Sequence, residues 1–170
     1  MVAFSKPEIW MRHRVSYGET DSMGVLYYAE YLHIFERGRN AYIRAFGVSY
    51  RDVEKRGLFL PVREARCRYR FPARYDDLLM QRTGSTEWRK ASFTFQYEIY
   101  DESRTRLMAE GFTQHACVDA AGKPVAVPAW FRELFRGCPD AFPEKAPESM
   151  AQGNAEGDFL GAVDHISVRK

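Results

Sequence analysis

Apolar residues spaced by threes and fours predict one long amphipathic helix in the first third of the chain. The apolar positions are Tyr31, Ile34, Phe35, Gly38, Ala41, Tyr42 and Ala45, and mostly charged residues take the other side. Gly47 follows Phe46 and suits the left-handed conformation that often ends a helix. Glycine in mid-helix costs about 1 kcal/mol relative to alanine. We therefore expect another backbone, supplied by a sheet wrapped around the helix, to come close to Gly38.

After Pro61 the hydrophobic pattern changes to strict alternation, which predicts strands. Apolar residues alternate with arginines over 65–71, and aromatic residues alternate with polar ones over 93–100. Weaker alternation predicts strands within 76–88 and 106–119, and residues 8–17 resemble a first strand. Short turns between successive strands favour antiparallel pairing. The expected fold class is α+β, with an antiparallel sheet of about five strands around one long helix and a short closing helix near Pro128.

The composition favours a single globular domain. The 170 residues carry 45% hydrophobic residues and a net charge of +2, so nothing in the overall charge points to nucleic acid or an anionic membrane. Three cysteines, without paired or His-rich spacing, argue against a disulfide framework and a zinc site. We expect reduced thiols and a cytoplasmic protein, because the amino terminus lacks a signal-peptide core and no segment approaches about 20 apolar residues.

The last part of the chain differs in composition from the rest. Residues 137–170 are rich in proline, glycine and glutamate, which predicts disorder, although the stretch FLGAVDHISV near the end is apolar enough to dock. We divide the chain into a domain at 1–136 and a C-terminal extension at 137–170 whose role the sequence leaves open.

The segment YGETDSMGVLYYAEYL, residues 17–32, carries the candidate chemistry. It places Asp21 in a short glycine-bearing turn, followed by several tyrosines and the long helix. On residue type alone, Asp21 is a turn or capping residue, because Asp suits both roles. By the same reasoning Arg89 and Lys90 form a solvated basic pair at a strand turn.

Other charged residues have simple interpretations from their positions. The row of Arg66, Arg68 and Arg70 is best explained as the solvent face of a strand, with a subunit or ligand contact as the alternative. Glu36 and Arg37 are expected to pair or cap on the helix surface. The chain has no second ligand at metal spacing beside its isolated histidines, so we propose no metal.

The stretch VSYGETDSMGVLYYAEYLHIFERGRNAYI resembles the signature of the hotdog-fold 4-hydroxybenzoyl-CoA thioesterase family, which includes the thioesterase associated with the bacterial Tol-Pal genes. The resemblance continues through LPVREARCRYRFPARYDDLL and EWRKASFTFQYEI and spans Val15 to Phe135. It implies the hotdog fold, with no cofactor. It also implies homodimers that pair edge to edge along residues 61–71 and often assemble into tetramers.

The resemblance assigns roles to individual residues. It makes Asp21 the catalytic carboxylate, as a nucleophile or as a general base for water. Many relatives carry histidine where this chain has Tyr28, and the resemblance implies that the backbone N–H of Tyr28 stabilises the oxyanion. The Tyr28 side chain is either a core tyrosine or part of the pocket lining. The implied substrate-binding residues are Gly24, Val25, Tyr27 and Tyr31, with Arg89, Lys90 and Ser92 at the phosphates of coenzyme A.

Hydrolysis of an acyl-CoA, or an aroyl-CoA, to free acid and CoA is the activity that the resemblance implies. The alternative is a non-catalytic hotdog module that binds acyl-CoA or a protein partner. A hotdog dehydratase fits less well, since those enzymes use a histidine-led site and this turn has no histidine.

Overall fold

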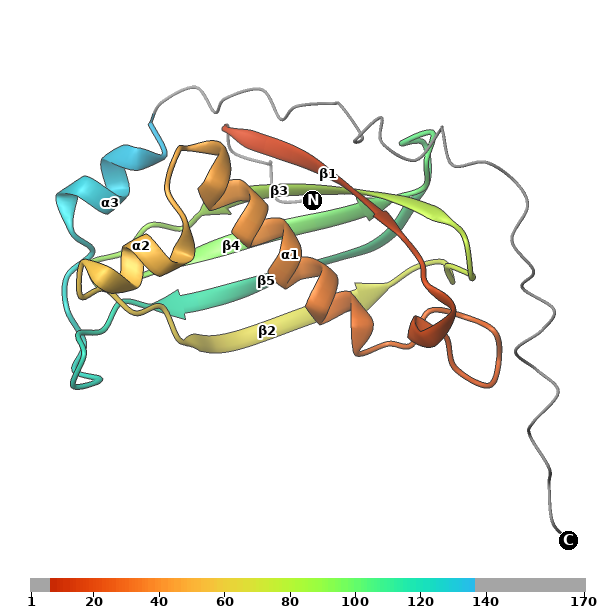
Figure 1. The fold of residues 1–170 in the computed structure, drawn as a ribbon, viewed down its shortest axis with the longest axis horizontal. Coiled ribbons are helices and arrows are strands. Elements are labelled where there is room, and N and C mark those ends of the chain that lie inside the picture. The colour runs from red at the N-terminus through yellow and green to blue at the C-terminus, as the bar shows by residue number, and fades with distance from the viewer. Residues whose placement is uncertain (1–6, 137–170) are drawn as a thin grey trace, which may run out of the picture.

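The computed structural model describes residues 7–136 as a five-stranded antiparallel sheet with one long helix across one face (Figure 1). The strands lie in the order β1-β3-β4-β5-β2. The α+β prediction is confirmed. The elements are β1 (Glu8–Arg14), the 3₁₀ helix η1 (Tyr17–Glu19), α1 (Glu30–Ala45), α2 (Tyr50–Lys55), β2 (Val62–Tyr69), β3 (Leu78–Thr86), β4 (Ser92–Tyr100), β5 (Leu107–Ala116) and α3 (Ala129–Leu134).

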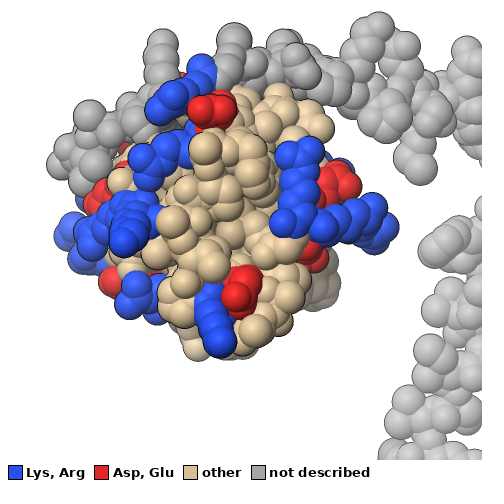
Figure 2. Space-filling model, turned by 90° about the vertical axis from the view of Figure 1, so that its left-hand side faces the viewer, with Lys and Arg blue, Asp and Glu red and all other residues tan. Residues whose placement is uncertain are grey.

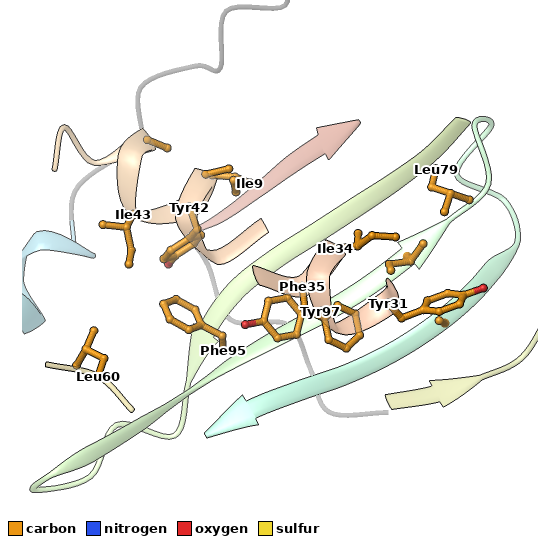
Figure 3. Close-up of a cluster of buried hydrophobic side chains, with 14 of the residues drawn as sticks. Ile9, Tyr31, Ile34, Phe35, Tyr42, Ile43, Leu60, Leu79, Phe95 and Tyr97 are labelled. Carbon is orange, nitrogen blue, oxygen red and sulfur yellow. The ribbon is translucent and has the colours of Figure 1, made fainter. Parts of the chain in front are cut away.

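The core lies between α1 and the inner face of the sheet (Figure 3). The predicted apolar side of α1 is buried, and the alternating aromatic residues of β4 face it. Phe35 stacks on Tyr97 with 4.3 Å between ring centroids, and Tyr42 meets Phe95 edge to face at 5.8 Å. These aromatic contacts fix the helix across the middle of the sheet.

The prediction for Gly38 is half right. A close neighbour does require glycine there, but that neighbour is a pair of side chains on β3 and not a backbone. A Cβ at Gly38 would lie 2.0 Å from the amide nitrogen of Gln81 and 2.7 Å from the hydroxyl of Thr83. Both residues are buried, so the inner face of β3 is polar where it passes under the helix.

The segment after α1 contains a helix that the hydrophobic pattern did not predict. Gly47 adopts φ +77°, as expected for a residue that ends a helix. The six-residue helix α2 then follows its N-cap residue Ser49, whose side chain accepts a hydrogen bond from the Asp52 amide while the Asp52 carboxylate accepts one from the Ser49 amide. Two turns are too short to show a hydrophobic period, and the capping pair is the signal that could have revealed them.

Strands β1 and β2 form the two edges of the sheet, so the prediction that residues 61–71 include an edge strand is confirmed. Nearly every residue of β2 is exposed, on both faces. Such an edge carries unpaired backbone groups that can pair with another strand. The predicted extension at 137–170, and Cys138 within it, lie outside the described residues. No helix among residues 7–136 is both long and apolar enough to span a membrane.

Candidate active site

Asp21 lies in a tight turn between η1 and α1. An isolated bridge joins Thr20 to Leu26, and the Asp21 amide donates to the Val25 carbonyl at 2.9 Å. The Oδ1 atom of Asp21 accepts hydrogen bonds from the amides of Met23 at 2.8 Å and Val25 at 3.4 Å. Its Oδ2 atom accepts none from the described residues. The carboxylate therefore stabilises its own turn with one oxygen and presents the other for further contacts.

Gly24 gives the turn its shape. Its φ is +72°, and nothing lies within 4 Å of the position that a Cβ would take. The requirement for glycine is therefore set by the backbone conformation and not by a neighbour. The next residues fix the turn against the segment before β3, because the Leu26 amide donates to the Ala73 carbonyl at 2.8 Å and Val25 bridges to Arg74.

One backbone amide at the start of α1 has no acceptor in the described part of the chain. The helix begins at Glu30 without a side-chain cap at Ala29. The Tyr27 amide donates to the Glu19 carbonyl at 2.8 Å, whereas the Tyr28 amide meets no acceptor among residues 7–136. Unpaired N–H groups at a helix start carry partial positive charge and favour an anion. This is the backbone position from which the resemblance predicts oxyanion stabilisation.

The interpretation of Tyr28 as a core tyrosine is wrong, because its side chain is 61% exposed. Its ring lies 4.5 Å from that of Tyr27. Interaction with the Tyr28 hydroxyl raises the pKa of Tyr27, and the negative charge of Asp21 contributes to the same shift. Tyr31 behaves differently: it is buried on the inner side of α1 and packs edge to face against Tyr69 at 5.0 Å.

Several aromatic side chains stay exposed around this turn. We call them the exposed tyrosine group, and its members are Tyr17, Tyr27, Tyr28, Tyr69 and Tyr75. Tyr17 and Tyr75 meet edge to face at 5.7 Å, and the Tyr69 hydroxyl donates to the Tyr28 carbonyl at 3.0 Å. A concentration of exposed aromatic area of this kind marks a surface for a ligand or a partner.

The predicted phosphate-binding residues lie at the other end of the sheet (Figure 1). The Asp21 loop leaves the sheet beside the start of β3, where the Val15 amide donates to the Asp77 carbonyl. Arg89 follows the end of β3, and nine strand residues span roughly 30 Å. A single chain therefore does not bring Asp21 and Arg89 together.

Arg89, Lys90 and Ser92 are not equally available at that end. The Arg89 guanidinium lies 3.6 Å from the carboxylate of Glu87, and both side chains are exposed. Ser92 is buried at the start of β4. In Figure 2, which views this end, lysines and arginines lie around an uncharged centre and do not form one basic patch.

The row of arginines on β2 lies on the outer face of the sheet, as expected, but its members differ. Arg70 pairs with Glu110 at 2.6 Å. Arg66 and Arg68 line an open groove of about 530 Å³. The charged lining of this groove consists of three arginines and three glutamates: Arg66, Arg68, Arg89, Glu64, Glu87 and Glu110. The groove is therefore balanced in charge.

Three residues beside the turn form a contact that the sequence did not reveal. The Glu19 carboxylate contacts His13 Nε2 at 3.1 Å and Arg37 at 3.2 Å, and Arg37 also lies 3.1 Å from His13 Nδ1. Glu36 pairs with Arg39 on the helix surface at 3.5 Å, as expected, whereas the partners of Arg37 lie outside the helix. Only the fold could show this, because 18 residues separate Glu19 from Arg37.

His115 is a buried structural residue in the core. Its Nδ1 lies 2.8 Å from the Leu60 carbonyl and its Nε2 lies 2.8 Å from the Thr113 hydroxyl. Burial lowers the pKa of His115 to about 4, so the ring is neutral at neutral pH. Residues 7–136 contain no group of three or more His, Cys, Asp or Glu side chains arranged to hold a metal ion.

Comparison with known proteins identifies the family of this chain. Residues 15–135 match the thioesterase-like superfamily. The chain belongs to this superfamily. It is 35% identical over 124 residues to the acyl-CoA thioesterase YbgC of Haemophilus influenzae. The aligned region covers 72% of this chain and 90% of that protein.

Solved structures show the same fold. A hypothetical protein from Aquifex aeolicus superimposes with a TM-score of 0.70 at 30% identity, over 75% of this chain and 98% of that one. A mutant 4-hydroxybenzoyl-CoA thioesterase, solved with 4-hydroxybenzoyl-CoA, gives a TM-score of 0.68 at 23% identity over 75% of this chain and 98% of that one. The predicted hotdog fold and family resemblance are confirmed.

Proposed function

We propose that this protein hydrolyses acyl-CoA thioesters to a free acid and CoA, with Asp21 as the catalytic residue. The observation that carries the proposal is the Asp21 turn. One carboxylate oxygen is fixed by two backbone amides, and the other, like the Tyr28 amide at the nearby helix start, has no hydrogen-bond partner among residues 7–136. Membership of the thioesterase-like superfamily and 35% identity to an acyl-CoA thioesterase support the reaction class.

Two routes fit a carboxylate in this position. As a general base, Asp21 takes a proton from water while the water oxygen adds to the thioester carbonyl carbon, and the resulting tetrahedral intermediate then releases the CoA thiolate, which takes up the proton. As a nucleophile, Asp21 itself adds to that carbon, releases the thiolate and forms a mixed anhydride that water then hydrolyses. In both routes negative charge grows on the carbonyl oxygen, and the Tyr28 amide at the start of α1 would stabilise it.

The exposed tyrosine group supports a bulky acyl group, including an aromatic one. Aromatic faces bury large apolar area and stack on planar rings, so they suit an aroyl-CoA. Short acyl chains remain within the same proposal, because the turn chemistry concerns the thioester and not the acyl group. A panel that contains acetyl-CoA, decanoyl-CoA and benzoyl-CoA would rank these classes.

We further propose that two chains pair antiparallel along β2 and that such pairs assemble into tetramers. The outer edge of β2, which pairs with no other strand in the described part of the chain, supports the pairing. Twofold pairing would set the Tyr69 end of one β2 beside the Val62 end of the other. It would thereby bring the Asp21 end of one chain toward the Arg89 end of its partner, which a single chain keeps roughly a strand length apart.

The test is the thiol released from the acyl-CoA panel by wild type, Asp21→Asn and a matched control. Asparagine keeps an acceptor for the turn but cannot act as base or nucleophile, so we expect kcat to fall about 100-fold or more. The control is Asp101→Asn, because Asp101 also accepts two backbone amides in a turn, from Thr105 and Arg106. We expect it to retain wild-type activity.

Two results would contradict the proposal. Wild-type protein that releases no thiol from any member of the panel would exclude the hydrolase, and binding of acyl-CoA without turnover would favour the non-catalytic module. Full activity in Asp21→Asn would remove Asp21 from the mechanism.

A further inference from the structure

We propose that Glu19 is a positioning residue for hydrolysis: its carboxylate, held between His13 and Arg37, fixes the Asp21 turn against α1. The inference rests on the proposed function, since it concerns where the catalytic carboxylate is held. None of the three residues belongs to the candidate catalytic or substrate-binding set.

The Glu19 carboxylate connects three parts of the chain. Its Oε2 accepts a hydrogen bond from the Ser16 amide at 2.8 Å and contacts His13 of β1 at 3.1 Å. Its Oε1 accepts from Arg37 of α1 at 3.2 Å. The His13 and Glu19 side chains are only 8% and 12% exposed, so their contact is screened less than a surface ion pair, whereas the Arg37 side chain is half exposed.

The backbone of Glu19 holds the far side of the same turn. Its carbonyl accepts a hydrogen bond from the Tyr27 amide at 2.8 Å, immediately before the Tyr28 amide, which has no acceptor within residues 7–136. Two residues after Glu19 comes Asp21 itself. Glu19 thus fixes both the backbone that leads into Asp21 and the backbone that carries the proposed oxyanion donor, the Tyr28 amide.

The contacts of His13 are mutually consistent for one form of the ring. With its proton on Nε2, neutral His13 donates to Glu19 and accepts at Nδ1 from Arg37. A second proton at Nδ1 would point at an N–H of Arg37. Burial and the charge of Arg37 lower the pKa of His13, while Glu19 and Glu30 act in the opposite direction.

The carboxylate keeps its charge in this surrounding. Burial opposes ionisation of Glu19, yet hydrogen bonds from Ser16, Arg37 and His13 keep its pKa below the usual value. Removal of that charge would leave Arg37 without its ion-pair partner and free the turn to shift relative to α1. Small displacements of a catalytic group lower kcat more than they change substrate affinity.

The experiment compares Glu19→Gln, Arg37→Met and Arg37→Lys with wild type, on whichever of acetyl-CoA, decanoyl-CoA and benzoyl-CoA is hydrolysed fastest. We expect kcat to fall about tenfold in the first two variants with KM within twofold, and Arg37→Lys to recover most of the loss. The control is Glu98→Gln, which removes another buried carboxylate paired with arginine, on the sheet face away from α1. We expect it to leave kcat unchanged.

A second measurement does not depend on turnover. Amide hydrogen exchange over residues 20–28 should become faster in Glu19→Gln, while exchange in β4 stays as in wild type. Unchanged kcat in Glu19→Gln, or unchanged exchange over 20–28, would overturn the positioning role and leave the proposed function standing. A wild-type protein inactive on every probe would overturn both.

Discussion

The two ends of α1 lie in contrasting surroundings. At the carboxyl end, aromatic rings are buried against one another: Phe131 contacts Trp88, Phe93 and Phe135 with ring centroids 5.1–6.1 Å apart. At the amino end, the rings of the exposed tyrosine group face solvent, and the helix start has no side-chain cap. Similar residues thus serve packing at one end and remain available at the other.

This contrast separates stability from function along one helix. The buried aromatic residues stabilise the fold by removing apolar area from water. The exposed tyrosine group gains little from such burial in the single chain, so its aromatic area is available to a substrate or to a second copy. Substitutions at the two ends should therefore change different measured quantities.

The largest expected effect is on stability, at the packed end. Phe131→Ala should lower the free energy of unfolding by about 3–5 kcal/mol, because Phe131 is fully buried. Urea unfolding followed by fluorescence measures this change. The control is Tyr17→Ala at the exposed end, where the side chain is 79% exposed and a change within about 0.5 kcal/mol is expected. Equal losses in both variants would erase the contrast.

The next effect is the dependence of stability on pH, again at the packed end. Burial lowers the pKa of His115 from 6.5 to about 4 in the folded chain. Between these values the unfolded chain binds a proton that the folded chain does not. The neutral His115 ring should therefore make its full contribution to the free energy of unfolding above pH 6.5. The protein should lose about 3 kcal/mol of that free energy as the pH falls from 6.5 toward 4.

The measurement is urea unfolding between pH 4 and 7.5 for wild type and His115→Gln. In the variant, the free energy of unfolding should fall less steeply with decreasing pH, because the titrating ring of His115 is gone. An unaltered slope in His115→Gln would show that the buried ring is not the titrating group.

The smallest expected effect lies at the exposed end. Tyr28→Phe should keep kcat within twofold of wild type, because the proposed oxyanion donor is the backbone amide and the side-chain hydroxyl has no part in it. Thiol release from the same acyl-CoA panel measures it, with Tyr27→Phe beside it for comparison. A loss of about tenfold in Tyr28→Phe alone would assign the hydroxyl a role in the reaction.

Local patterns predicted much of this fold and the position of the turn. The spacing of Ile34, Phe35 and Tyr42 gave the buried side of α1, and alternation over 93–99 gave β4. The Asp21 turn could be predicted in the same way, because Asp and Gly favour turns through contacts with their own neighbouring backbone. These features depend on neighbours in the sequence, so the sequence contains the information directly.

Contacts between distant residues could not be predicted in the same way. The alternation of β3 was weak because Gln81 and Thr83 face inward under Gly38, an arrangement visible only once helix and strand are packed. The partners of Arg37 lie on η1 and β1. The distance between Asp21 and Arg89 follows from the length and direction of β3, which no residue of the site specifies.

The sheet order also has a consequence for the chain while it is being made. Neighbouring strands β3, β4 and β5 follow one another directly, so each finds its partner soon after synthesis. Strand β2 comes earlier than all three but pairs only with β5, and 40 residues separate Arg70 from its ion-pair partner Glu110. A growing chain therefore exposes β2 unpaired until β5 has been synthesised.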